Sequence, residues 1–179
     1  MIALLLTGCG DAAARERQLE ERRDALAEAG RIAFTAQVTA HTGREVFSCV
    51  LDCEATAEEM GVTVREPAEI AGIRATVGAG GTQLEYEDVS LSAGSADSLG
   101  DGPLAAMPLL LEALRQGHIL RVWQERDGET EFTAAEVYVD EARELTLWFL
   151  PEELTPVRAS LRRDGAEYLV CRIQNFTWE

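Results

Sequence analysis

The chain has 179 residues, of which 46% are hydrophobic and 27% charged, and this balance is typical of one globular domain with an ordinary core. Its sixteen basic residues, all arginine, stand against 32 acidic ones, so the formal net charge is −16. Such an acidic surface repels phosphate backbones and anionic headgroups, which excludes nucleic acid as a partner and excludes membrane docking through a basic patch.

The first nine residues resemble a bacterial lipobox. An apolar run ends in Leu6-Thr7-Gly8-Cys9, where small residues precede a cysteine whose thiol can accept diacylglycerol. A signal peptide also carries a basic n-region and an apolar segment of roughly 7–15 residues, yet no basic residue precedes Cys9. We expect that the start is placed too late, that residues 1–8 are the remnant of a lipoprotein signal peptide, and that Cys9 is the lipid anchor. The alternative is a short apolar N-terminus that contains a cysteine by chance.

Residues 11–30 are predicted to form a helix, because alanine, leucine, glutamate and arginine predominate and Gly30 supplies a stop. Its glutamates and arginines are spaced for pairing within the helix. Few apolar residues recur at helical spacing, so only a narrow stripe can dock. We expect the segment 9–30, with the anchor at its start, to contribute the first helix of the fold rather than a spacer.

From Arg31 the hydrophobic period changes to two, which is typical of strands. Short strands alternate with turn residues, as in an antiparallel meander. These strands are expected at residues 32–38, 46–53, 60–65, 73–77, 82–86 and 89–91.

A leucine-rich insert then breaks the strand pattern. A polar, glycine-rich loop at 95–102 is followed by a helical stretch at 103–117. Pro103 and Pro108 both suit the first position of a helix, so we expect a short turn and then a helix near 108–116. The leucines expected to face inward are Leu110, Leu111 and Leu114.

Strands resume after the insert, at residues 119–125, 131–139, 144–150, 157–162 and 167–177. A sheet of about ten strands is too large to stay flat and must curl. The expected fold is therefore mainly β (α+β), a curled antiparallel sheet that forms an unclosed half-barrel with helices over its concave face. We expect that face to carry Phe47, Leu51, Leu145, Leu147 and Phe149. Such an arrangement can leave an apolar cavity.

Three further cysteines accompany Cys9. Cys49 and Cys53 fall in one predicted strand, about 13 Å apart at the usual rise per residue, so they cannot bridge each other while that strand is regular. Either all three are small buried apolar side chains, or Cys171 bridges to one of the other two.

The C-terminal stretch contains three recognisable motifs, Leu145-Thr146-Leu147-Trp148-Phe149, Thr155-Pro156-Val157-Arg158 and Asp164-Gly165. Together they resemble the late hairpin of the LolA-like family, the superfamily of lipoprotein carriers and their anchored relatives. With the helix-first order and the insert near 103–117, the resemblance covers most of residues 11–179, and it places the half-barrel domain at 31–179. It implies an unclosed barrel with a helical lid and a cavity for acyl chains or other apolar ligands.

The function expected from these features is that of an exported lipoprotein, held on the outer side of the cell membrane through Cys9, that binds a lipid or another apolar small molecule without catalysis. The alternative is a module with a filled core that recognises another cell-envelope protein. His41 and His118 lack partners at ligand spacing and are expected in turns, so we expect no catalytic residue, metal or cofactor. The residues expected to line the cavity are Phe34, Phe47, Leu51, Leu111, Leu147 and Phe149.

Overall fold

The computed structural model describes residues 9–95 and 99–179, with the side chains of 9–12 and of Thr42 outside the description. The eight residues predicted to be a signal-peptide remnant therefore lie outside the described part of the chain. Eleven strands form one antiparallel sheet within it. Their bounds are β1 (Arg31–Thr42), β2 (Glu45–Thr56), β3 (Glu59–Glu66), β4 (Arg74–Gly78), β5 (Gly81–Tyr86), β6 (Val89–Gly94), β7 (His118–Asp127), β8 (Thr130–Tyr138), β9 (Arg143–Phe149), β10 (Pro156–Arg163) and β11 (Ala166–Trp178).

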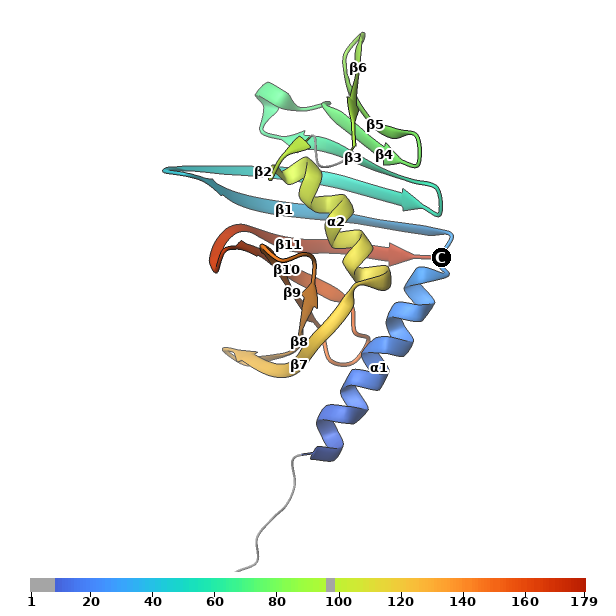
Figure 1. Ribbon diagram of the computed structural model, residues 1–179, viewed down its shortest axis with the longest axis vertical. Helices are drawn as coiled ribbons and strands as arrows, with labels where there is room; N and C mark the ends of the chain where they lie inside the picture. Colours follow the sequence, from blue (N-terminus) through green and yellow to red (C-terminus); the bar gives the residue numbers. More distant parts are fainter. Residues whose placement is uncertain (1–8, 96–98) are drawn as a thin grey trace, which may run out of the picture.

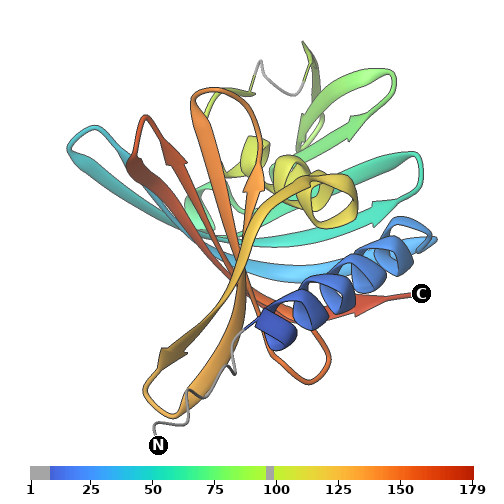
Figure 2. The ribbon, with the colours of Figure 1, turned by 60° about the horizontal axis from the view of Figure 1, so that its bottom comes forward.

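The sheet consists of two meanders that meet along the first and last strands. Its order is β6-β5-β4-β3-β2-β1-β11-β10-β9-β8-β7, so each meander runs outward from the central β1–β11 pair. Figure 2 shows that the sheet curls around a helix without closing, since the edge strands β6 and β7 are not paired with each other. The predicted half-barrel is confirmed, and every strand lies within a few residues of its predicted position.

Two α-helices lie on the concave side of the sheet in the described part, α1 (Cys9–Ala27) and α2 (Pro103–Gln116). A short 3-10 turn, η1 (Ala68–Ile70), connects β3 to β4. Helix α2 crosses the concave face, and the C-terminal part of α1 lies beside the lower end of α2 (Figure 1). No helix among the described residues is long and apolar enough to span a bilayer.

The predicted start of α2 near Pro108 is wrong, because the helix begins at Pro103 and continues through Pro108. Proline inside a helix removes one backbone hydrogen bond and crowds the preceding turn. Here that cost is offset by burial, since the helix packs an apolar face against the sheet. The buried residues of that face are Ala106, Met107, Leu110, Leu111, Ala113 and Leu114.

The core lies between the concave face and α2, and alternate residues of each strand point into it. Leu145, Leu147 and Phe149 of β9 are each at most 1% exposed, and Leu51 of β2 is fully buried. The predicted strand phase is therefore confirmed at these positions.

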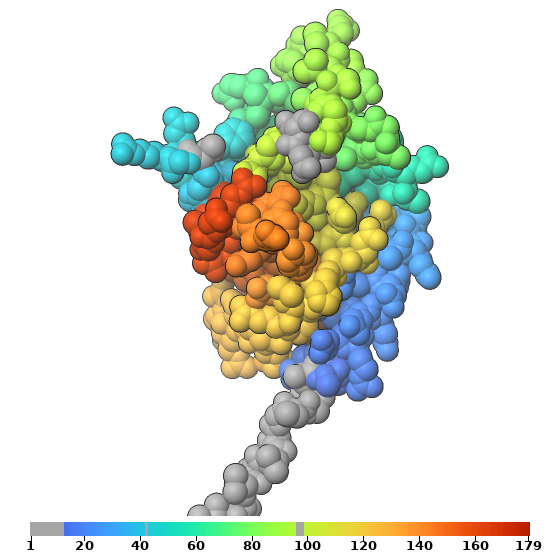
Figure 3. All heavy atoms as spheres, in the orientation of Figure 1, coloured from blue at the N-terminus to red at the C-terminus, as the bar shows by residue number. Residues whose placement is uncertain are grey.

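Phe47 is the exception, because it shares the concave face of β2 but is 38% exposed. The last pairing of β3 with β2 is Glu66 opposite Val50, so Phe47 lies beyond the end of the neighbouring strand. The β1–β2 hairpin projects from the body of the molecule in Figure 3. Phe47 thus lies on the predicted face, but the expectation that it lines the covered interior is wrong, because the alternation of a strand gives the face of a residue and not whether other residues cover it.

Phe149→Ala should lower the free energy of unfolding by about 3–5 kcal/mol, because it removes a large, fully buried side chain and leaves a cavity. Phe47→Ala is the matched control and should cost about 1 kcal/mol or less, as a partly exposed position does. Urea denaturation of both variants measures the difference. Equal losses would contradict the packing described here.

Candidate functional site

The space beneath α2 is filled by side chains. Five of the six residues predicted to line a cavity meet in one core cluster with the leucines of α2, and the sixth, Phe47, stays outside it. The five are Phe34, Leu51, Leu111, Leu147 and Phe149. The prediction thus brought together residues that are close in space, and they form a packed interior in this conformation.

A cleft of about 310 Å³ lies beside α2 instead of beneath it. One wall is the outer side of the helix, and the facing wall is the loop from β8 to β9, with Val77 of β4 and Gly100 completing the rim. Its polar side chains include Glu112, Gln116 and Arg143, and most of the rest is apolar. The residues of this cleft that sequence reasoning did not single out for binding include Ala105, Leu109, Tyr138 and Val139.

A second cleft of about 170 Å³ adjoins the first, where the helix faces the turn between β2 and β3. Met60, Leu111 and Arg115 contribute to its lining. The two clefts meet over the outer side of α2, since Val77, Pro108, Glu112 and Gln116 border both.

Arginine side chains hold the C-terminal end of α2. Arg23, on α1, donates from Nε to the Leu114 carbonyl at 3.4 Å and from Nη2 to the Gly117 carbonyl. The last carbonyls of a helix have no partner within the helix and carry partial negative charge, so a buried cation is stabilised there. Burial lowers the pKa of the Arg23 guanidinium, which nonetheless stays protonated at neutral pH.

Sequence reasoning assigned Arg23 to pairing within α1, but the side chain is only 9% exposed and bonds to α2. Leu19 and Leu26 are fully buried on the same helix face, four residues before and three after it. The sequence signal for this contact is the position of Arg23 at helical spacing between Leu19 and Leu26, which places all three on one face of α1. Arg115 acts in the same region, donating to the carbonyls of Thr56 at 3.0 Å and Ala29 at 3.5 Å.

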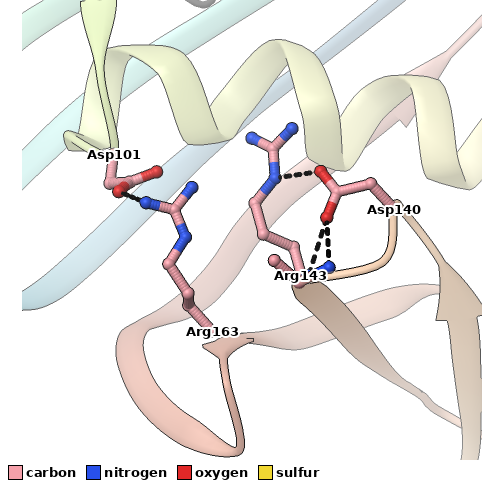
Figure 4. A network of polar contacts seen from close by, with 5 residues as sticks. Asp101, Asp140, Arg143 and Arg163 are labelled. Atoms are coloured by element: carbon pink, nitrogen blue, oxygen red, sulfur yellow. Dashed lines mark hydrogen bonds and ion pairs between the residues drawn. The ribbon is translucent and has the colours of Figure 1, made fainter.

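Two ion pairs lie along α2, one at the start of the helix and the other farther along it (Figure 4). Arg163 of β10 pairs with Asp101, which lies two residues before the helix, and Arg143 of β9 pairs with Asp140 in the β8–β9 loop, with Nε 2.6 Å from Oδ2. Burial works against the charged form of Asp140, but bonds from Arg143 and from the N–H groups of Ala142 and Arg143 outweigh it and lower the pKa of this carboxyl. Of these four side chains, that of Arg143 lines the cleft beside α2.

The three described cysteine thiols are free and buried. Cys49 and Cys171 both face Val38 from opposite neighbouring strands, so one strand separates them and the alternative of a Cys171 disulfide is wrong. Burial raises the pKa of Cys49 to about 11 and that of Cys171 to about 12, and raises the pKa of Cys53 well above its ordinary value. These thiols stay protonated at neutral pH, so none is an activated nucleophile.

The two histidines lie in strands rather than in turns, since His41 is in β1 and His118 begins β7. Among the described residues, no group of three or more His, Cys, Asp or Glu side chains is arranged to hold a metal ion. The Cys9 side chain lies outside the described part, so its lipidation stays a prediction.

Replacing Arg23 by methionine should lower the free energy of unfolding by about 1.5–3 kcal/mol, because the carbonyls at the end of α2 lose a charged donor. Methionine keeps most of the apolar stem, so packing changes little. Arg17→Met removes the same charge from an exposed site whose Nε bonds only within α1, at 3.3 Å to Ala13, and should change stability little. Thermal and urea unfolding measure both; a stable Arg23→Met variant would contradict the bridging role.

No family model and no curated protein matches the chain. Solved structures do match it over nearly their whole length. An uncharacterised conserved protein from Thermus thermophilus is 10% identical, with a TM-score of 0.55, and the match covers 92% of this chain and 87% of that one. A domain assigned to outer membrane lipoprotein sorting from Vibrio parahaemolyticus is also 10% identical (TM-score 0.53, 92% and 93% covered).

The Mycobacterium tuberculosis lipoprotein LppX is 14% identical, with a TM-score of 0.51 over 92% of this chain and 95% of that one. At such identities the comparisons establish the fold alone. The fold they establish is the one that the resemblance of the C-terminal hairpin and the order of helices and strands predicted. The chain has the LolA-like half-barrel fold.

Proposed function

We propose that this protein is an exported lipoprotein, anchored through Cys9, whose half-barrel binds an apolar ligand such as a lipid or acyl chain without catalysing a reaction. The observation that carries the proposal is the cleft of about 310 Å³ beside α2, lined by apolar side chains such as Leu109 and Val139 together with polar ones. Its volume is at the lower end of the range for small-molecule sites, and a few polar groups at the rim suit the orientation of a ligand.

The attachment of α2 supports a binding role. Polar contacts attach the helix near its two ends, through Arg23 and Arg115 at the C-terminal end and through Asp101 before the first residue. The buried side chains between these contacts are apolar. An apolar chain can replace apolar contacts of this kind at little cost. If α2 moves outward, the cleft joins the region around Phe34, Leu51, Leu111, Leu147 and Phe149, and these residues then line the enlarged site.

The fold comparisons support the same class of function. The match to a domain assigned to lipoprotein sorting and the match to the lipoprotein LppX both cover more than nine-tenths of each chain. Proteins of this shape thus include lipoproteins, and we infer the same for this chain. The protonated, buried thiols fit a binding protein rather than one that uses a cysteine nucleophile.

Ligand binding is tested with a fluorescent fatty acid titrated into the non-acylated Cys9→Ser protein. We expect saturable enhancement of fluorescence and a higher melting temperature, since a ligand at a hundredfold excess over its Kd adds about 2.7 kcal/mol of stability. Leu109→Trp places a larger side chain in the cleft and should weaken binding by at least about tenfold.

Leu91→Trp is the control, because Leu91 lies on β6 and is 60% exposed. It should leave both the affinity and the melting temperature unchanged. A protein that binds no probe and gains no stability is not an apolar-ligand carrier.

The anchor is tested by placing a basic leader before Met1 and expressing the chain in a bacterial host. We expect the protein in the membrane fraction with the mass of an acylated cysteine, and Cys9→Ser should release it. Helix α1 begins at Cys9 and its first fully buried residue is Leu19, so the anchor lies about 15 Å along the helix from the docked part. A serine variant that remains membrane-bound rules out this anchor.

A further inference from the structure

Arg143, which lines the cleft, and Arg163 of the neighbouring strand form a pair of like charges. They lie directly opposite each other on β9 and β10, and Figure 4 shows both side chains pointing toward α2. Like charges in directly opposed positions destabilise a sheet, so the pair requires anionic partners. In a chain with a net charge of −16, two directly opposed arginines, one of which lines the cleft, are a local exception.

Two carboxylate partners of the pair come from loops. Asp101 lies in the segment before α2, and Asp140 lies between β8 and β9; their side chains are 39% and 40% exposed. Asp140 is held by the N–H groups of Ala142 and Arg143, whereas the Asp101 carboxylate can return to water if another anion takes its place. Arg143 also lines the cleft itself, alongside Leu109 and Val139, so a charge beside it is adjacent to apolar surface.

The guanidinium of Arg163 is incompletely satisfied. It donates from Nη1 to Asp101, while its Nε is enclosed and has no hydrogen-bond partner among the described residues. Its charge also lies 5.9 Å from the centre of the Tyr168 ring. A buried donor without a partner is costly, and an oxyanion that binds the guanidinium in two-pronged fashion removes that cost.

We propose that Arg143 and Arg163 bind the anionic head, a carboxylate or phosphate, of a single-chain amphiphile whose apolar part occupies the cleft beside α2. The carboxylate of Asp101 holds the place of that head in the unliganded protein. Displacement of the Asp101 carboxylate breaks the ion pair that connects the start of α2 to β10. Binding of the anionic head therefore loosens α2 over the apolar part of the ligand. This inference rests on the proposed function and names the ligand class for that same site.

The test compares dodecanoate, dodecyl phosphate and dodecanol, which share one tail, by calorimetric titration of the full chain carrying Cys9→Ser. We expect one or both anions to bind at least about tenfold more tightly than dodecanol, as charge-assisted hydrogen bonds do. The stronger of the two anions identifies the head as carboxylate or phosphate. The double variant Arg143→Gln/Arg163→Gln should lose the preference and keep the affinity for dodecanol.

Two further variants separate recognition of the head from a change in folding. Arg162→Gln removes the same charge from an exposed neighbour that bonds to the Gly165 carbonyl at 2.6 Å, and it should keep the preference. Asp101→Asn removes the competing carboxylate and should raise the affinity for the anions severalfold. A misfolded protein does not bind more tightly, so this increase is specific to the proposed exchange.

Equal binding of the anions and dodecanol by the unmutated site, or a preference that survives in the double variant, overturns the inference and leaves the proposed apolar site in place. Binding of none of the three ligands overturns both. An Asp101→Asn variant with unchanged or weaker affinity for the anions contradicts the exchange between Asp101 and the head.

Discussion

The pairing of β1 with β11 is the constraint on which the rest of the molecule depends. Each of these strands begins or ends one meander, and their ladder is the only hydrogen-bonded seam between the two halves in the described sheet. Backbone bonds of 3.0 Å in both directions between Arg31 and Glu179 close its end, and Gln37 contacts Gln174 across 137 residues of sequence. Contacts of such sequence separation form late, because the entropy of closing the loop opposes them. The concave face is complete only after this seam has formed.

Helix α2 has attachments of different chemistry at its two ends. At its C-terminal end the cation of Arg23 meets backbone carbonyls, and this contact comes from α1 rather than from the sheet. At its other end Asp101 meets Arg163, a contact between two partly exposed side chains. Exposed ion pairs contribute little and exchange readily, whereas a buried donor to helix carbonyls is costly to remove. The two ends therefore differ in strength, and the weaker one depends on Arg163, which lies directly opposite the cleft residue Arg143.

The sequence predicted the fold well because alternation and turn residues are local properties of each strand. It predicted the faces of Leu51 and Phe149 correctly for the same reason. It did not predict burial where burial depends on neighbouring strands. Phe47 lies on the predicted face but is exposed, because β3 ends before it can cover that side chain. The sequence also did not predict the cleft beside α2, because hydrophobic periodicity gives the buried face of each element but not the space left between elements after they pack. The pairing of Arg143 with Arg163 depends on the register of two strands, which composition and spacing do not fix.

The edges of the sheet are joined by a helix instead of by a hydrogen-bonded ladder. Strand β6 leads through α2 to β7, so the connection from one rim to the other is a segment of chain with side-chain contacts. In a closed barrel the circumference is fixed by the register of its strands. Here no hydrogen-bonded ladder joins the two rims in the described sheet, so the register of the strands does not fix the distance between them. The width of the half-barrel therefore depends on the side chains packed inside it, including those of α2.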